Sequence, residues 1–98
     1  MNDIIHSPTR LRIMAMMMEE GIGRRVSFKR MTETLGVTKG NLSVQLRKLE
    51  GAGYIRIIKS FSASGVPATH IELTTTGRGA FILYVRELRR ILGRIIDL

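Results

Sequence analysis

Residues 38–53, TKGNLSVQLRKLEGAG, constrain the fold of this chain more than any other segment. Leu42, Leu46 and Leu49 recur at intervals of four and three residues, which is the spacing of one face of an α-helix. The pattern predicts a helix over residues 39–50 that buries this leucine stripe against the rest of the chain. Such a helix has a fixed outward face, and the composition of that face indicates what it contacts.

The outward face of this predicted helix carries small, polar and cationic side chains and almost no acid. At about 100° per residue, Val44, Arg47 and Lys48 lie opposite the leucines, with Asn41 and Ser43 beside them. A solvated helix face usually mixes both signs of charge, so this composition favours contact with a polyanion. An ordinary surface helix is the alternative interpretation.

The preceding segment predicts a second helix and a tight turn. Ser27 is typical of the N-cap of a helix over residues 28–35, and Gly36 is a stop signal after it. Thr38 stands at the N-cap of the next helix, because its oxygen can accept a hydrogen bond from a free amide of the first turn. So short a connection is typical of a helix–turn–helix. A short strand is predicted just before, in residues 24–28.

The N-terminal part of the chain predicts a first helix over residues 7–20. Ser7 and Pro8 are typical of an N-cap and a first helical position, and Gly21 is a natural end. Residues 1–6 are expected to form a short extended lead-in.

This first helix is rich in methionine and apolar on nearly every side. A helix of this kind is buried between neighbours or lies in a subunit contact. Core filling explains the methionines better than an adaptable ligand pocket does. Met14 and Met17 are also candidates for a dimer interface.

Two strands after the helix–turn–helix predict a β-hairpin, or wing, over residues 54–74. YIRIIKSFS, residues 54–62, is rich in isoleucine, and THIELT, residues 69–74, alternates between apolar and polar side chains. The ASGVPA segment between them has the small residues, glycine and proline of a loop.

The last segment predicts a long amphipathic helix over residues 75–97. Its apolar stripe has a coiled-coil spacing, and so small a domain cannot cover that much apolar surface alone. A second copy of the chain is the simplest partner. The stripe, and hence the expected dimer interface, consists of Phe81, Val85, Leu88, Leu92 and Ile95.

Composition narrows the partners of this domain. The chain has 98 residues and a formal net charge of +8, which favours nucleic acid first and an anionic membrane surface second. It has no cysteine, which excludes disulfides and thiolate metal sites. No apolar run approaches the roughly 18 residues that a membrane span needs, and no secretory signal is visible. A cytoplasmic, nucleoid-associated protein is therefore expected.

Several motifs together resemble a known family. LSVQLRKLEGAGYIRIIKSF, then Pro67-x-Thr69, then LTTTGRGAF resemble the small stand-alone winged-helix DNA-binding regulators related to the MarR and ArsR families. HSPTRLRIMAMM is similar to the first helix of the same group, so the resemblance covers residues 6 to about 90. It implies a homodimeric transcriptional regulator in which the second helix of the helix–turn–helix enters the major groove of DNA. The wing would approach the minor groove or the backbone.

The resemblance also implies which residues face DNA. On this sequence they are Thr38, Lys39, Asn41, Ser43, Val44, Arg47 and Lys48, and Lys59 is the cation nearest to the wing tip. The sequence departs from the family at the tip itself, residues 62–68, which has no charge where relatives commonly carry arginine or lysine. A modest backbone role is therefore expected of the wing.

Chemistry assigns roles within this set. Arg47 is the best candidate to read guanine, because its guanidinium fork matches O6 and N7, and Asn41 could pair with adenine or bind phosphate. Lys39, Ser43 and Lys48 are expected to hold phosphates. A two-fold dimer would bind a palindromic operator with half-sites about 34 Å apart.

The expected fold is therefore mainly α with a small β-hairpin (α+β): one winged helix-turn-helix domain over residues 1–98 with a long C-terminal dimerisation helix. The expected function is sequence-specific binding of double-stranded DNA in transcription regulation. A non-specific architectural DNA-binding protein and a winged-helix protein-interaction module are the alternatives. No enzyme activity, cofactor or metal site is expected, because His6 and His70 have no cysteine or carboxylate cluster at ligand spacing. The sequence identifies no small-molecule effector.

Overall fold

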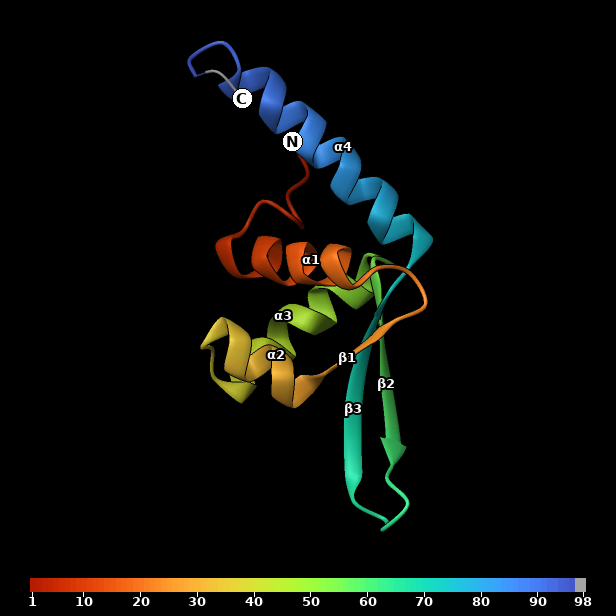
Figure 1. The fold of residues 1–98 in the computed structure, drawn as a ribbon. Coiled ribbons are helices and arrows are strands. Elements are labelled where there is room, and N and C mark those ends of the chain that lie inside the picture. The colour runs from red at the N-terminus through yellow and green to blue at the C-terminus, as the bar shows by residue number, and fades with distance from the viewer. Residues whose placement is uncertain (97–98) are drawn as a thin grey trace.

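The computed structural model describes residues 1–96, which form four helices and a three-stranded antiparallel sheet (Figure 1). In chain order the elements are α1 (Pro8–Glu20), β1 (Arg25–Ser27), α2 (Phe28–Leu35), α3 (Lys39–Gly51), β2 (Ile55–Phe61), β3 (Pro67–Leu73) and α4 (Thr75–Leu92). This is the α+β winged-helix architecture that the sequence predicts.

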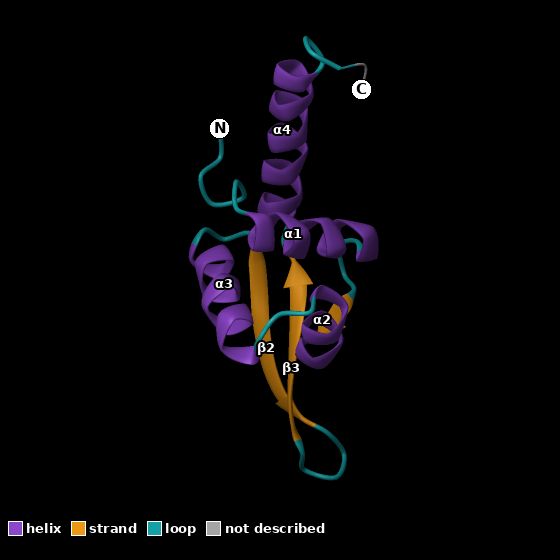
Figure 2. Ribbon diagram, turned by 90° about the vertical axis from the view of Figure 1, so that its left-hand side faces the viewer, coloured by secondary structure: helices purple, strands orange, loops and turns teal. Residues whose placement is uncertain are grey.

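The sheet lies along one side of helices α1, α2 and α3, and its two long strands extend beyond them (Figure 1). The strand order is β1-β3-β2, so the short β1 pairs with β3 on the side away from β2. Figure 2 shows α1 crossing one end of the strands, with α3 and α2 on either side. The β2–β3 hairpin projects past them in one direction, and α4 projects in the other (Figure 1). The two projecting elements therefore lie at opposite ends of the molecule.

Three of the four helices have an N-cap that acts through its side chain. Ser27 accepts a hydrogen bond from the Arg30 amide at 3.0 Å, Thr38 from the Asn41 amide at 3.1 Å, and Thr74 from the Gly77 amide at 2.9 Å. Ser7 occupies the N-cap position of α1, but its side chain makes no capping bond. The Pro8 that follows lacks one of the amides that a cap would satisfy, so α1 depends less on its cap.

One hydrophobic core joins the sheet to the helices. Gly36 adopts the left-handed conformation (φ 65°) that turns the chain from α2 toward α3, so both helices can pack on α1. On β3, Ile71 and Leu73 are buried as the alternation predicts. The fully buried side chains are Ile5, Ile13, Met14, Met17, Val26, Met31, Leu42, Leu46, Leu49, Ile55 and Ile71.

The assignment of Met14 and Met17 to a dimer interface is wrong. Both side chains have no exposed surface within a single chain, so no partner can reach them in this fold. They fill the space between α1 and its neighbours, because α1 is covered by α3, α2 and the sheet as well as by α4. Their role is core packing, which the sequence already favoured over a ligand pocket.

The expected extended lead-in is instead a compact turn against the core. The side-chain oxygen of Asn2 accepts hydrogen bonds from the amides of Ile4 and Ile5, both at 2.9 Å. The Asn2 amide donates to the hydroxyl of Tyr54 at 2.9 Å, and Ile5 is fully buried. This packing gives the N-terminal residues an ordered path along α4 (Figure 1).

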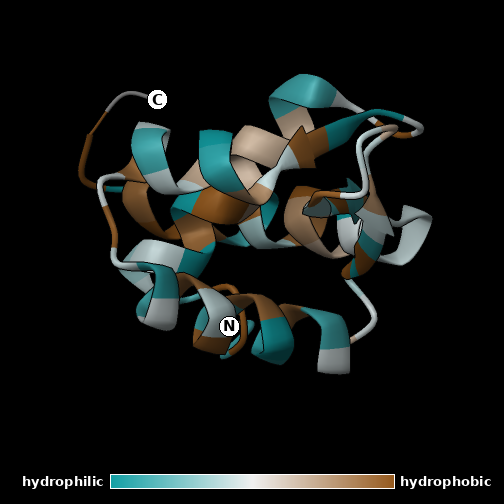
Figure 3. Cartoon of the chain, turned by 90° about the horizontal axis from the view of Figure 1, so that it is seen from below, coloured by the Kyte–Doolittle hydropathy of each residue, from teal (hydrophilic) through white to brown (hydrophobic). Residues whose placement is uncertain are grey.

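The last helix is shorter than predicted. It ends at Leu92, and Gly93 forms the C-cap. The prediction extended the helix to residue 97, which lies outside the described part of the chain. Glycine lowers helix stability by about 1 kcal/mol relative to alanine, and no burial compensates because Ile95 is 79% exposed. Figure 3 shows apolar residues continuing to the end of the described chain.

The apolar stripe of α4 is divided between two environments. Phe81, Val85 and Leu88 pack partly against the core of their own chain, and Tyr84 is buried there. The hydroxyl of Tyr84 lies 2.9 Å from Nδ1 of His6, in the N-terminal turn. The first half of the predicted dimer stripe is therefore partly used within the chain.

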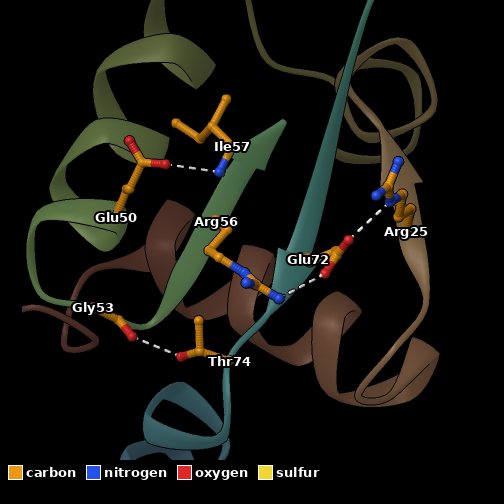
Figure 4. A network of polar contacts seen from close by, with 7 residues as sticks. All are labelled: Arg25, Glu50, Gly53, Arg56, Ile57, Glu72 and Thr74. Carbon is orange, nitrogen blue, oxygen red and sulfur yellow. Dashed lines mark hydrogen bonds and ion pairs between the residues drawn. The ribbon is translucent and has the colours of Figure 1, made fainter. Parts of the chain in front are cut away.

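The solvent face of the sheet carries an ion network. Glu72 on β3 accepts a hydrogen bond from Arg25 of β1 at 2.8 Å and another from Arg56 of β2 at 3.1 Å (Figure 4). The hydrogen bond from Arg25, helped by the charges of both arginines, holds the pKa of Glu72 below its usual value. The network ties all three strands together on the side away from the helices.

A close backbone contact joins the start of α4 to the end of α3. Thr74 donates its hydroxyl hydrogen to the Gly53 carbonyl at 2.6 Å (Figure 4), and its amide donates to the Tyr54 carbonyl at 3.1 Å. Gly77 is buried against the Tyr54 backbone, and a Cβ at this position would lie 2.7 Å from the Tyr54 carbonyl carbon. Only glycine allows this approach, which explains the first glycine of the GRG sequence.

Replacement of Gly77 by alanine is expected to lower the free energy of unfolding by about 3 kcal/mol, because the added Cβ overlaps backbone atoms that cannot move aside. Gly79→Ala is the matched control. It lies in the same helix with open space around it and should be neutral or stabilising by up to about 1 kcal/mol. Urea denaturation of both variants measures the difference, and equal stabilities would contradict the close contact.

Thr38→Ala is expected to cost about 1 kcal/mol of unfolding free energy, because it removes the acceptor for the Asn41 amide. Thr38→Ser should retain most of that stability. Ser7→Ala provides the comparison, since Ser7 makes no side-chain capping bond and its loss should change stability less. A larger loss at Ser7 than at Thr38 in thermal or urea unfolding would contradict this assignment.

Candidate nucleic-acid interface

Helix α3 is held with its leucine stripe inward. Leu42, Leu46 and Leu49 are buried against the core. Fixing this face leaves the opposite face in solvent, where Val44 is 41% exposed. The outward face predicted from helical periodicity is the one that the structure exposes.

A groove of about 680 Å³ runs between α3 and the β2–β3 hairpin. It brings together four residues of the expected DNA-facing set: Lys39, Ser43 and Arg47 from α3 and Lys59 from β2. Lys59 lies in the next element of the chain and lines the groove opposite α3, because β2 packs beside α3. The groove thus combines three cations from two elements.

The other expected contact residues lie outside this groove. Thr38, Asn41, Val44 and Lys48 are all exposed but are absent from its lining. The Thr38 hydroxyl is occupied by the capping bond to the Asn41 amide. Seven of the eight predicted residues therefore lie on α3 or at its N-cap, and three of these seven line the groove beside the wing: Lys39, Ser43 and Arg47.

The side chain of Asn41 is tied to α1 through a chain of hydrogen bonds. Its oxygen accepts from the Gln45 amide at 3.1 Å, and the Gln45 oxygen accepts from Arg10 at 2.6 Å. Sequence reasoning missed Arg10 and Gln45, because Arg10 lies in α1 and nothing in its local pattern points to α3. Asn41 is consequently held in one orientation on the exposed surface.

One acidic residue, Glu50, belongs to the groove, and sequence reasoning did not select it. Its carboxylate accepts a hydrogen bond from the Ile57 amide at 2.7 Å (Figure 4). This bond connects the last turn of α3 to the start of β2. Glu50 therefore helps to fix the angle between the helix and the wing.

Thr69 is a further groove residue that the sequence analysis did not select. It pairs with Lys59 across the hairpin, so the two side chains share one face of the sheet. Thr69 could be identified from the register of β2 and β3, which sets it opposite Lys59. Lys29, at the start of α2, lines a second depression of about 620 Å³ between α2 and β3, which shares Thr69 with the groove.

The cations of the interface are free of acidic partners within residues 1–96. The ion pairs in this part of the chain join Met1 to Glu87, Arg30 to Glu20, and Arg25 and Arg56 to Glu72. Lys39, Arg47, Lys48 and Lys59 take part in none of them. Free exposed cations are available to neutralise phosphates without breaking an existing pair.

Two other kinds of site find no support among the described residues. No group of three or more histidine, aspartate or glutamate side chains is arranged to hold a metal ion in residues 1–96. None of the helices in the same range is long and apolar enough to cross a membrane.

Comparison with known proteins agrees with this geometry. A family model described as a winged helix DNA-binding domain matches residues 9–92 of the chain. An uncharacterized protein from Methanocaldococcus jannaschii is 34% identical over 92 residues, which cover 94% of this chain and 96% of that protein.

Solved structures show the same fold. A transcriptional regulator homologue from Pyrococcus horikoshii OT3 superposes with a TM-score of 0.84 at 27% identity, covering 97% of this chain and 89% of that one. The transcriptional regulator BldR from Sulfolobus solfataricus superposes with a TM-score of 0.71 at 22% identity, covering 94% of this chain and 63% of that one. The chain belongs to the winged helix DNA-binding domain family, as its sequence motifs predict.

Proposed function

We propose that this protein is a homodimeric transcriptional regulator that binds specific sites in double-stranded DNA, with α3 in the major groove. The observation that carries the proposal is the exposed surface of α3. It presents unpaired cations and short polar side chains, while the opposite face is fixed in the core. An α-helix presented in this way fits the width of the major groove.

The roles within α3 follow from position and chemistry. Arg47 reads guanine, because its two parallel donors match the O6 and N7 acceptors of that base. Lys39 and Ser43, near the helix N-terminus, hold a phosphate together with free amides of the first turn. Asn41, oriented through Gln45, contacts a base or a phosphate, and Val44 meets a thymine methyl group.

Two further cations complete the footprint on the backbone. Lys48 lies on the exposed side of α3 away from the wing groove, and Lys59 lies within that groove. They would neutralise phosphates on the two strands that border the major groove. Such contacts set register and strengthen binding without reading sequence.

The second half of α4 and the residues after it support dimerisation. This end of the chain projects beyond the domain (Figure 1) and leaves apolar residues uncovered: Ile91, in the last turn of α4, is 46% exposed, and Ile95, just after the helix, is 79% exposed. Leu92 continues the helical face on which Phe81, Val85 and Leu88 pack partly against the core. A second copy of α4 packed against this part would bury the surface and place two α3 helices on one side of a duplex. The corresponding operator is palindromic, with half-sites about 34 Å apart.

Binding to DNA is tested by fluorescence anisotropy at two salt concentrations, with the DNA upstream of the protein's own gene and a scrambled duplex of equal length. A preference of about a thousandfold that survives moderate salt is expected of a site-specific regulator. Equal and steeply salt-dependent binding would instead identify an architectural DNA-binding protein. Failure to bind either duplex at low salt would overturn the proposal in favour of a protein-interaction module.

Arg47→Ala is expected to cost about 1–3 kcal/mol on the preferred site and to relax specificity at one position, because a bidentate base contact is lost. Lys39→Ala should weaken binding to all sequences alike and lower the salt slope by about 1. Arg24→Ala, an exposed arginine in the loop between α1 and β1, is the control for removal of one positive charge. Equal losses for Arg47→Ala on the preferred and scrambled duplexes would remove its base-reading role.

Ile91→Arg is expected to convert the dimer to a monomer, because it places a charge in the uncovered apolar face of α4. Ile22→Arg is a matched control, since Ile22 is the same residue type with nearly the same exposure (47% against 46%) but lies in the loop after α1. Light scattering measures the mass of each variant. A dimeric Ile91→Arg protein would show that this part of α4 is not the principal contact.

A further inference from the structure

The tip of the hairpin is apolar, uncharged and strongly exposed. Phe61 at the end of β2 is 74% exposed, and Val66 in the adjoining loop is 58% exposed. Residues 60–69 contain no charged side chain, and Lys59 is the cation just before them. An aromatic side chain left in water at the end of a projecting arm is unfavourable unless a partner covers it.

Phe61 continues the wall of the basic groove. Side chains alternate along a strand, so Ile57, Lys59 and Phe61 share one face of β2. Ile57 and Lys59 line the groove beside α3, and Phe61 is the next residue outward on that face. The register agrees, since Lys59 pairs with Thr69 and Phe61 with Pro67. A ligand that fills the groove would therefore meet Phe61 at its outer end.

The loop beyond Phe61 is closed by its own hydrogen bonds. The Ser62 amide donates to the Val66 carbonyl and the Gly65 amide to the Ser62 carbonyl, both at 2.8 Å. The Val66 amide donates to the Ser62 hydroxyl at 3.1 Å. These amides are already used within the loop, so the tip offers a partner mainly its apolar side chains.

The hairpin extends outward from the groove by a distance similar to the spacing of the grooves of DNA. Phe61 lies four residues beyond Ile57, or about 13 Å along the strand at 3.3 Å per residue. With about 34 Å per turn, the neighbouring minor groove lies roughly half a turn, or about 17 Å, from the major groove. If α3 lies in the major groove, the tip therefore arrives close to the flanking minor groove.

We infer that Phe61 enters this minor groove as an apolar wedge and partly unstacks one base step, with Lys59 holding the adjacent phosphate. Apolar side chains of this kind, phenylalanine and proline among them, insert between base steps and kink the duplex. The steps that yield most easily are pyrimidine–purine steps. The inference rests on the proposed function and adds a preference for a deformable step beside each half-site.

The test uses full-length protein and a duplex enriched by the wild-type protein from a random-sequence pool. 2-Aminopurine replaces adenine, one position at a time, at the pyrimidine–purine steps that flank the enriched site, because its fluorescence rises when it unstacks. The wild-type protein is expected to raise the fluorescence at one step severalfold. Phe61→Ser should abolish the rise and weaken binding about tenfold, the size expected from loss of one aromatic contact to a base.

Three variants separate this contact from others. Phe61→Leu keeps an apolar wedge and should retain most of the fluorescence rise. Phe61→Arg should lose it while increasing the salt slope by about 1. Arg47→Ala should bind more weakly but show the full rise at saturating protein. Because Phe61 is exposed, all Phe61 variants should melt within about 2 °C of the wild type.

Two results would overturn the inference and leave the proposed function standing. One is tight, Arg47-dependent binding with no fluorescence change at any flanking step. The other is a Phe61→Ser protein with unchanged affinity and fluorescence, or one that loses only self-association in light scattering. Absence of wild-type binding to any duplex at low salt would overturn the proposed function as well.

Discussion

The packing of the α3 leucines is the contact on which the proposed interface depends. Leu42, Leu46 and Leu49 have almost no exposed surface, so the helix cannot rotate about its axis without exposing them. The same constraint keeps the cationic side of α3 in solvent. Glu50 adds a second restraint at the end of the helix, where its carboxylate bonds to the start of β2. The bond between Glu50 and the Ile57 amide thus links the orientation of α3 to the position of the wing.

A second constraint separates the two ends of the molecule. Thr74 and Gly77 hold the start of α4 against the Gly53–Tyr54 turn, immediately after α3. The helix leaves this corner in the direction opposite to the hairpin (Figure 1). Its uncovered apolar end therefore lies far from the basic groove. A partner bound along α4 and a duplex bound along α3 would not compete for surface.

Local signals were sufficient for much of the fold. The bounds of α2, Phe28–Leu35, follow from Ser27 and Gly36, because a cap and a left-handed glycine act within one turn. The errors arose where the outcome depends on distant residues. The end of α4 at Leu92 was missed because the stripe continues past Gly93, although no packing supports it there. Met14 and Met17 were misplaced because periodicity shows that a face is apolar but not what covers it.

The sequence by itself determined the order of the elements, the inward face of α3 and the set of side chains on its outward face. These properties follow from the 3.6-residue period and from capping, which need no knowledge of the rest of the chain. Only the tertiary structure decided that Lys59 and Thr69 line one groove with Arg47, that Glu50 enters it, and that Arg10 orients Asn41 through Gln45. The physical reason is that these contacts join different helices and strands, and such contacts are set by how the elements pack rather than by local pattern.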